Sequence, residues 1–262
     1  MQPLLNIAIN AARQAGDIIL RHAEQVHRLK IMPKGDGDFY CDVDIKAEQA
    51  IINAIHKAYP EHGIIAEESG NFQDDAESVW IIDPLDGTKN YLHGFPFYAV
   101  SIALRVKNRI EHAVVYDPLR HECFSASRGG GARLNDHRMR VSKATQLNLA
   151  MLGSGFPVRN KALAERYLHS YDGFVGHCAG VRSTGSAALD LAYVATGRLD
   201  GFWGFALKPW DIAAGTLLVQ EAGGLISDLQ GGEQYLKSGD VIAGTPKIFK
   251  SVLQTLRQGI ES

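Results

Sequence analysis

The segment WIIDPLDGTKN places two acids and a possible helix start at the end of an apolar run. The acids are Asp83 and Asp86, and the run before them has the length of a strand. Pro84 lacks an N–H and restrains the turn, Gly87 permits unusual backbone angles, and Thr88 can begin a helix. The free N–H groups of a helix start favour an anion such as phosphate, and carboxylates beside them can hold a hard cation. The segment therefore indicates metal-assisted chemistry on a phosphate, although ordinary strand-to-helix turns use the same residue types.

Two further segments supply acids of the same kind. IIAEESG ends an apolar run in Glu67 and Glu68, and KPWDIAAG places Asp211 at the expected N-cap of a helix, where capping alone could explain it. Clustered carboxylates raise one another's pKa, so the three segments would need a neutralising cation if they converge. Two Mg²⁺ ions roughly 3.5–4 Å apart could activate a water and stabilise the leaving oxygen of a phosphate ester. The spacing of the segments in the sequence leaves their convergence open.

Two other kinds of phosphate chemistry are disfavoured by the residues present. LDGT is similar to the DxDGT signature of haloacid dehalogenase-type phosphatases, but Pro84 stands where their nucleophilic aspartate would precede Asp86. The glycines at 129–131 are followed by Ala132 and Arg133 instead of the Lys and Ser/Thr pair of a P-loop. We interpret these glycines as a tight turn between strands.

The first half of the chain, residues 1–147, has the pattern of an α+β unit. Apolar residues at three- and four-residue spacing predict one helix from Pro3 and another from near Asp44 that ends before Pro60. Five apolar runs of strand length then follow in succession, at residues 63–66, 79–82, 99–105, 112–116 and 123–127. This half carries most of the candidate metal ligands, and Thr88 is expected to open a short helix within it.

The second half, residues 148–262, has the alternating pattern of an α/β unit and carries Asp211. Segments of strand length are found at 149–153, 224–227 and 241–243. Segments of helix length are found at 162–171, 186–195, 211–221 and 248–256. Because no linker rich in Pro or Ser separates the halves, we expect them to pack as one unit.

Composition excludes several classes of protein. The 262 residues are 45% hydrophobic, which is enough for a full core, and the net charge of -2 gives no reason to expect nucleic acid as the main ligand. The three cysteines form no CxxC pair, so neither a disulfide framework nor a zinc knuckle is indicated. Polar residues interrupt the first twenty positions, so we expect no signal peptide or membrane span and predict a cytoplasmic protein.

Several motifs resemble, in the same order, those of the inositol monophosphatase family. The likeness covers nearly the whole chain and is carried by AEES, WIIDPLDGT, RSTGSAALDLAYVATGRLDGF and PWDIAAGTLLVQEAGG. The stretches MQPLLNIAINAARQAG and VYDPLRHECFSASRGGGARLN are most similar to the bacterial SuhB-type members. The resemblance implies a layered αβαβα sandwich, a homodimer, two or three Mg²⁺ ions and inhibition by lithium. It also implies direct attack of a metal-activated water on inositol monophosphate or a related small sugar or nucleotide phosphate.

The resemblance further implies a set of metal ligands. A first metal would be held by Glu67, Asp83 and the backbone carbonyl of Leu85. A second would be held by Asp83, Asp86 and Asp211.

Catalytic and substrate-binding residues are implied in the same way. Glu67 and Thr88 would orient the attacking water, and Asp44 would support that water and a weaker third metal. A role for Asp44 as a helix N-cap remains equally open. Phosphate and the rest of the substrate would meet Asp86, Gly87, Thr88, Gly185 and Ala187.

Two departures from the family pattern bear on the substrate. Gly204 stands where the family usually has a Glu that hydrogen-bonds the inositol hydroxyls, so selectivity for a polyol is weakened and space for a larger substrate is expected. Lys89 replaces a common Thr, and its ammonium could assist phosphate binding, weaken metal binding or, as is commoner for lysine, face solvent. An alternative function, which would tolerate Gly204, is an interaction protein of the bacterial transcription machinery with weak or secondary phosphatase activity.

Overall fold

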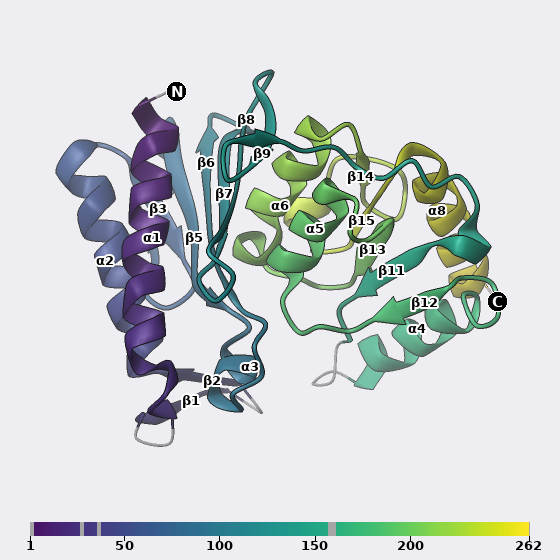
Figure 1. Cartoon of the computed structure of the whole chain (residues 1–262), viewed down its shortest axis with the longest axis horizontal. Coiled ribbons are helices and arrows are strands. Elements are labelled where there is room, and N and C mark those ends of the chain that lie inside the picture. Colours follow the sequence, from purple (N-terminus) through teal and green to yellow (C-terminus); the bar gives the residue numbers. More distant parts are fainter. Residues whose placement is uncertain (1–2, 27–28, 36–37, 157–160, 262) are drawn as a thin grey trace.

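The computed structural model of the chain describes residues 3–26, 29–35, 38–156 and 161–261. Its elements form five layers, which lie side by side in Figure 1. A pair of helices covers one face of a first sheet, a second pair lies between that sheet and a second sheet, and a third pair covers the outer face. The predicted αβαβα sandwich is therefore confirmed.

The first layer consists of the two helices predicted from apolar spacing, α1 (Pro3–Ala23) and α2 (Asp42–Ala58). The buried residues of α1 include Ala8, Ala12 and Ala15, whose small side chains let the helix lie close to its neighbours. In the sequence, the two helices are separated by an antiparallel hairpin of β1 (Ile31–Gly35) and β2 (Asp38–Cys41). Apolar spacing did not predict this hairpin.

The first sheet has eight strands in the order β10-β9-β8-β7-β6-β5-β3-β4. Its strands are β3 (Gly63–Ala66), β4 (Gly70–Phe72), β5 (Ser78–Asp86), β6 (Ala99–Val106), β7 (Arg109–Asp117), β8 (Glu122–Ser127), β9 (Gly131–Leu134) and β10 (His137–Arg138). All neighbours are antiparallel except β3 and β5, which run parallel with Ala66 opposite Ile82. The parallel pairing brings the ends of both strands, with the acids that follow or occupy them, to one edge of the sheet.

A bulge in β5 lies between the two acids of the DPLD sequence. Asp83 is paired with Ser101 and Asp86 with Ala99, so β5 holds one more residue than β6 over this interval. The extra residue bends the strand, and Pro84 suits the bulge because it has no N–H to donate to a neighbour. The chain then enters the short helix α3 (Thr88–Leu92), as predicted.

The second half contains a five-stranded mixed sheet in the order β12-β11-β13-β15-β14. Its strands are β11 (Met151–Ser154), β12 (Gly180–Arg182), β13 (Gly201–Gly204), β14 (Leu225–Ser227) and β15 (Val241–Gly244). Its helical elements are η2 (Leu147–Leu149), α4 (Lys161–Asp172), α5 (Ala187–Thr196), α6 (Pro209–Glu221), α7 (Tyr235–Ser238) and α8 (Pro246–Glu261). The predicted helices and strands of this half are confirmed, whereas β12 and β13 had no sequence signal that we recognised.

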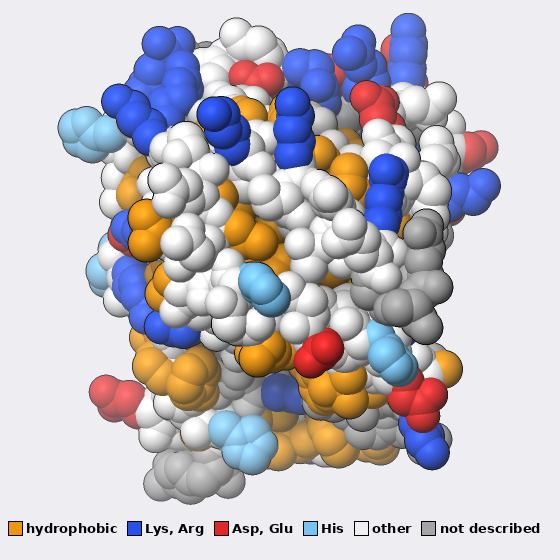
Figure 2. Space-filling view, turned by 90° about the vertical axis from the view of Figure 1, so that its right-hand side faces the viewer, with side chains coloured by type: hydrophobic (Ala, Val, Ile, Leu, Met, Phe, Trp, Pro, Cys, Tyr) orange, Lys and Arg blue, Asp and Glu red, His pale blue; other side chains and the backbone are white. Residues whose placement is uncertain are grey.

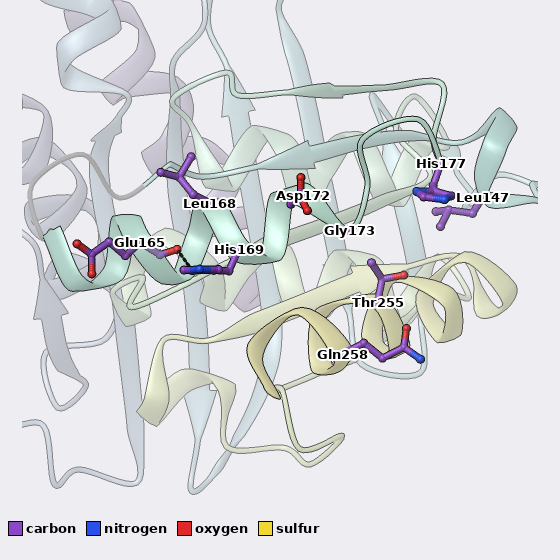
Figure 3. A pocket seen from close by; sticks show the side chains of 9 residues that line it. All are labelled: Leu147, Glu165, Leu168, His169, Asp172, Gly173, His177, Thr255 and Gln258. Atoms are coloured by element: carbon purple, nitrogen blue, oxygen red, sulfur yellow. Dashed lines mark hydrogen bonds between the residues drawn. The ribbon is translucent and has the colours of Figure 1, made fainter. Parts of the chain in front are cut away.

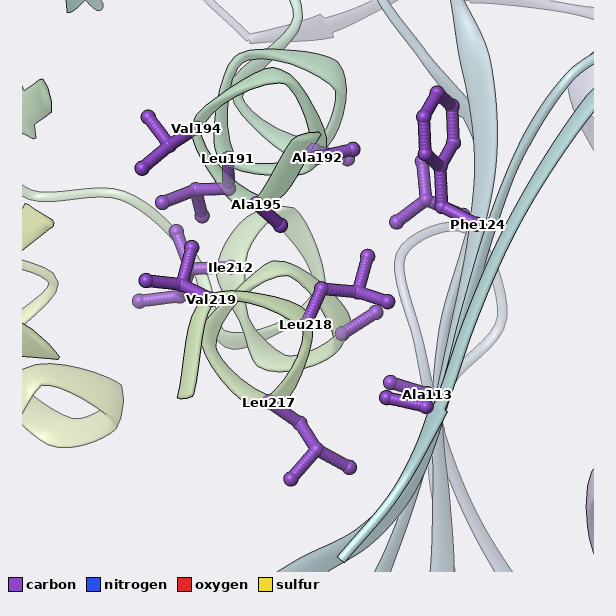
Figure 4. Close-up of a cluster of buried hydrophobic side chains, with 14 of the residues drawn as sticks. Ala113, Phe124, Leu191, Ala192, Val194, Ala195, Ile212, Leu217, Leu218 and Val219 are labelled. Atoms are coloured by element: carbon purple, nitrogen blue, oxygen red, sulfur yellow. The ribbon is translucent and has the colours of Figure 1, made fainter. Parts of the chain in front are cut away.

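Helices α5 and α6 form the central layer and join the two halves through one hydrophobic cluster. Figure 4 shows side chains of these helices, such as Ala192 and Leu218, directed toward Phe124 and Ala113 of the first sheet. The two helices are close because Gly215 has no side chain, since a Cβ there would lie 2.5 Å from Cβ of Leu191. No helix within the described ranges is long and apolar enough to cross a membrane.

Candidate active site

A cavity of about 490 Å³ is lined by residues from both halves of the chain. It receives the end of β5, the start of α3, the start of α5 and the start of α6. All of the residues predicted for the site line it except Asp44, which lies just behind Thr88: Glu67, Asp83, Leu85, Asp86, Gly87, Thr88, Gly185, Ala187 and Asp211. The three acidic segments therefore converge on one cavity.

A larger cavity of about 790 Å³ lies elsewhere, between α4 and α8. Figure 3 shows His169 beside Glu165 on α4, with Thr255 and Gln258 across the groove on α8. It contains none of the predicted site residues and no cluster of buried acids, so its size does not make it the better candidate.

Asp83 and Glu67 occupy the neighbouring ends of two parallel strands. The Glu67 N–H donates to the carbonyl of Ile82 at 3.2 Å, which continues the pairing of β3 with β5 and places the two acids next to each other. Asp83 is buried, and its Oδ1 accepts the N–H of Leu85 at 3.0 Å. This local hydrogen bond holds the carboxylate within the bulged turn.

Asp86 connects the end of β5 to the start of α5. Its Oδ2 accepts the hydroxyl of Ser186 at 2.6 Å and the N–H of Ala188 at 2.8 Å. Ser186 is the N-cap of the ten-residue helix α5 and Ala188 lies in its first turn, where free N–H groups favour an anion. The other carboxylate oxygen of Asp86 is left for the cavity that the residue lines.

Asp211 lies in the first turn of α6, but the prediction that it is the N-cap is wrong. Lys208 is the N-cap and Pro209 takes the first helical position, because proline is tolerated there and its fixed φ suits a helix. Asp211 is the third helical residue, and its Oδ2 accepts the N–H of Lys208 at 2.7 Å. Asp211 therefore both accepts a capping hydrogen bond at the start of α6 and lines the cavity.

The interpretation of Asp44 as the N-cap of a helix is wrong, because Cys41 is the N-cap of α2 and Asp44 is its third helical residue. The Oδ2 of Asp44 accepts the backbone N–H of Cys41 at 2.8 Å, which caps α2. Its Oδ1 lies 2.9 Å from the hydroxyl of Thr88, and this hydroxyl is also 2.9 Å from the carbonyl oxygen of Leu85. Asp44 therefore reaches the candidate site through Thr88, and it is buried.

The acids of the cavity raise one another's pKa. Burial raises the pKa of Asp83 well above its usual value, and the charges of Glu67, Asp86 and Asp211 raise it further. Burial also raises the pKa of Asp86 to about 7, despite the hydrogen bonds that it accepts. The pKa of Asp211 is raised by burial and by the charge of Asp86. Protein groups alone leave this negative charge poorly compensated.

Lys34 supplies a cation that the sequence interpretation missed. Its Nζ lies 3.1 Å from Oε1 of Glu67 and 2.9 Å from Oε1 of Glu68. The burial of Glu68 still raises the pKa of that carboxyl to about 7. A second contact fixes the same turn, because Glu48 accepts the N–H groups of Glu68 and Ser69 at 2.9 and 2.8 Å.

The donor set fits hard divalent cations, although the described residues contain no group of three or more His, Cys, Asp or Glu side chains already arranged to hold a metal ion. Carboxylates and a backbone carbonyl are the oxygen ligands that Mg²⁺ prefers. The raised pKa values of Asp83 and Asp211 show that ionisation of these carboxyls is unfavourable without a cation, which would stabilise the ionised form. An ion held by Glu67 would compete with Lys34 for this carboxylate.

The turn that carries Gly87 has no room for a larger residue. Gly87 has a φ of +93°, and a Cβ at this position would lie 2.9 Å from the carbonyl oxygen of Phe97. Asn90 then fixes the opposite wall, because its Nδ2 donates to the carbonyls of Phe97 at 2.7 Å and Thr184 at 2.8 Å. Gly185 follows directly and has a φ of +85°. Asn90 thus ties the α3 turn to the start of α5.

Asp190 is a cavity residue that the sequence interpretation missed. It is buried, lines the cavity and accepts the hydroxyl of Thr184 at 2.9 Å. Burial raises its pKa well above the usual value, and the charge of Asp86 adds to this effect. The available signal was an acid within the otherwise apolar sequence of α5.

The expectation that Gly204 opens space for a larger substrate is wrong. A Cβ at position 204 would lie 2.6 Å from Cδ1 of Leu207, so that side chain already occupies the space beside the glycine. Lys89 lines the same cavity as the acids and does not lie on a remote surface.

Comparisons with known proteins show the family and the fold of the chain. A sequence model of the inositol monophosphatase family matches residues 1–261. Nus factor SuhB of Pseudomonas aeruginosa is 50% identical over 98% of this chain and 97% of that protein. The crystal structure of extragenic suppressor protein suhB from Bartonella henselae has a TM-score of 0.96 and 41% identity, and covers 99% of this chain and 100% of that one. The structure of a Thermotoga maritima IMPase has a TM-score of 0.90 and 32% identity, with 99% of each chain covered.

Proposed function

This chain belongs to the inositol monophosphatase family, and we propose that it is a Mg²⁺-dependent phosphomonoesterase of the cytoplasm. Its substrate would be inositol monophosphate or a related small sugar or nucleotide phosphate. The observation that carries the proposal is the convergence of Glu67, Asp83, Asp86 and Asp211 on one cavity beside Thr88. Four acids around one cavity, of which Glu67 is paired with Lys34, are costly to keep ionised unless they serve to bind metal.

We assign two Mg²⁺ ions to the carboxylates, following the resemblance. Glu67, Asp83 and the carbonyl of Leu85 would hold one, and Asp83, Asp86 and Asp211 the other, with Asp44 near a third. When bound, such ions lower the pKa of water and offset the negative charge of a phosphate ester.

Thr88 is positioned to orient the attacking water. Its hydroxyl has one proton and two acceptors at equal distance, Asp44 Oδ1 and the carbonyl of Leu85. When Thr88 donates to Asp44, its lone pairs are free to accept a hydrogen from water, and Asp44 can take up the proton because burial raises its pKa. Glu67 would accept from the same water.

Backbone groups would bind the rest of the substrate. The N–H groups of Gly87 and Thr88 would receive phosphate oxygens, and the backbone at Gly185 and Ala187 would face the alcohol that leaves. The fixed geometry of Gly185, which Asn90 secures through Thr184, supports this assignment.

The proposal is tested by phosphate release. Purified protein is incubated with inositol 1-phosphate and a panel of sugar and nucleotide monophosphates, with and without Mg²⁺. Release that requires Mg²⁺ and is inhibited by Li⁺ supports the proposal. No release from any ester, with Mg²⁺ binding verified by calorimetry, would refute it.

A second role is favoured by the names of relatives. Proteins called Nus factor SuhB are 50% identical over nearly the whole chain, so we propose that this chain also binds a protein of the transcription machinery. Affinity capture with a catalytically inactive Asp86→Asn variant would test whether this role is independent of catalysis. Recovery of no transcription protein by either form would contradict it.

We also propose that the protein is a homodimer. Large apolar side chains are exposed on the α4 and η2 side of the molecule, with Leu149 70%, Leu168 56% and Val175 59% exposed. Figure 2 shows that side, where hydrophobic side chains are visible across the lower part of the face. Light scattering coupled to size exclusion tests the mass, and a monomer at micromolar concentration would contradict the proposal.

A further inference from the structure

The candidate active-site cavity has an apolar part as well as an acidic one. Its hydrophobic lining comes from β2, the loop after β11, α4, the loop after β13 and the start of α6: Phe39, Phe156, Leu163, Phe205, Leu207 and Trp210. Two of these rings expose a large fraction of their surface, 41% for Phe39 and 38% for Phe156. Apolar surface that remains exposed inside a polar cavity is a common feature of ligand sites.

Phe156 is held in place from behind. Its ring packs edge-on against Tyr167 of α4, with 4.9 Å between centroids, and Tyr167 in turn stacks on the buried Trp203. The N–H of Gly155 donates to the carbonyl of Trp203 at 3.3 Å and fixes the backbone before the ring. A ring that is fixed on one side and exposed on the other presents a ready surface for another flat group.

Two charged residues, Arg166 and Asp240, support the apolar part of the cavity from outside it. The guanidinium of Arg166 lies over the ring of Phe205, 4.4 Å from its centroid, and pairs with Asp240 at 2.8 Å. Asp240 also accepts the N–H of Ala206 at 3.2 Å. Neither Arg166 nor Asp240 lines the cavity, so their charges support the wall without facing a ligand.

The loop after β13 turns Leu207 onto the place where a side chain at position 204 would lie. Ala206 has a φ of +52°, a conformation that alanine rarely adopts, and the N–H of Leu207 donates to the carbonyl of Gly239 at 3.0 Å. Cδ1 of Leu207 therefore lies 2.6 Å from where a Cβ of Gly204 would be. Residues 204–207 (GFAL) carry no side-chain hydrogen-bond donor or acceptor.

We infer that this apolar part is a subsite for a planar aromatic ring on the alcohol that carries the phosphate. A polyol would bury hydroxyl groups against Phe156 and Leu207 without partners, which disfavours binding. A flat ring would gain contact with the same surfaces, and Ser183 and Lys208 line the cavity where they could meet polar ring edges. The inference rests on the proposed phosphatase function and defines the substrate class of that same cavity.

The test compares esters that differ only in the ring. Adenosine 5′-phosphate and ribose 5-phosphate carry the phosphate on the same primary alcohol, and benzyl phosphate tests whether a ring without a sugar suffices. We expect kcat/KM for the nucleotide to exceed that for ribose 5-phosphate by about tenfold or more, as stacking of one base typically provides. Phe156→Ser and Leu207→Asn should each bring this ratio close to one. Leu225→Asn is the matched control, because Leu225 is 39% exposed and lies outside the cavity.

Binding of adenosine without phosphate separates this inference from the proposed function. Saturation-transfer NMR with the same variants should show adenosine contacts, but no ribose contacts, that Phe156→Ser and Leu207→Asn remove and Leu225→Asn keeps. If no ester is hydrolysed but this binding pattern holds, the phosphatase proposal fails and the subsite stands. If esters are hydrolysed with a nucleotide-to-sugar ratio near one, or the variants leave the ratio unchanged, the subsite is refuted.

Discussion

The hydroxyl of Thr88 lies 2.9 Å from Oδ1 of Asp44, which joins the first turn of α2 to the turn after β5. The same hydroxyl is 2.9 Å from the carbonyl of Leu85. One proton is thus shared between a buried carboxyl and a carbonyl that we assign to a metal. A water held by Thr88 can pass a proton to Asp44 without any side chain moving.

Thr88→Val should lower phosphate release by about 10²-fold, because valine has a similar shape but cannot orient water or relay a proton. The lost hydrogen bond should cost about 1 kcal/mol in the free energy of unfolding, measured by denaturant titration. Thr88→Ser keeps the hydroxyl and should retain most of the activity. Equal activity in the valine and serine variants would exclude a role for the hydroxyl.

Lys34→Met should strengthen Mg²⁺ binding by a few-fold. The wild-type ammonium lies 3.1 Å from Oε1 of Glu67, so it competes with an ion for this carboxylate, and a partly exposed pair of this kind contributes up to about 1 kcal/mol. Calorimetric titration with Mg²⁺ measures the change. Lys46→Met is the control, because Lys46 pairs with Asp42 on the exposed side of α2 and should leave the affinity unchanged. Weaker binding in the Lys34 variant would mean that the lysine supports the site instead of competing for it.

The sequence predicted those parts of the site that depend on local pattern. Asp83, Asp86 and Thr88 follow one another across a strand end, and the strand, turn and helix that hold them have recognisable composition. The proximity of Glu67 was predicted only through the family resemblance. Physically it results from the parallel pairing of β3 with β5, a long-range contact that apolar spacing does not specify.

Other features depended on contacts between distant segments and could not be predicted locally. Lys34 reaches Glu67 from a hairpin without apolar periodicity, and Asp190 is hidden in an apolar helix. Leu207 fills the space beside Gly204 only because Ala206 adopts a positive φ and donates its N–H to Asp240, far along the chain. The glycine at position 204, in place of the Glu usual in the family, therefore suggested open space, but the fold places the Leu207 side chain there.

The stability of the metal-free protein should fall as the pH rises from about 4 to 7. Asp86 has a folded pKa of about 7 against an unfolded value near 4, so the folded state binds more protons across this range. Stability is therefore greatest below the unfolded pKa and is lost as the pH rises through the folded one, with a slope of up to about 1.4 kcal/mol per pH unit for each such group. Denaturant titrations in EDTA at several pH values measure this slope.

Excess Mg²⁺ should flatten or reverse that dependence, because the ion stabilises the ionised carboxylates. Asp86→Asn should reduce the slope in EDTA and should abolish turnover. A metal-free protein whose stability rises from pH 4 to 7 would contradict the charge distribution derived for the cavity.

Gly87→Ala should reduce both stability and activity, because two separate effects act at this position. The φ of +93° strains any L-residue, and the new Cβ would lie 2.9 Å from the carbonyl oxygen of Phe97, which is backbone and cannot move aside easily. Gly94→Ala is the matched control, since its φ is +68° and no atom lies within 4 Å of a Cβ there. We expect a loss of about 1 kcal/mol for Gly94→Ala from the backbone alone, and a loss larger by about 1–3 kcal/mol for Gly87→Ala from the added clash. Phosphate release should fall only in the Gly87 variant. If the two substitutions had similar effects on stability and activity, the close approach of Gly87 to Phe97 would not constrain the turn.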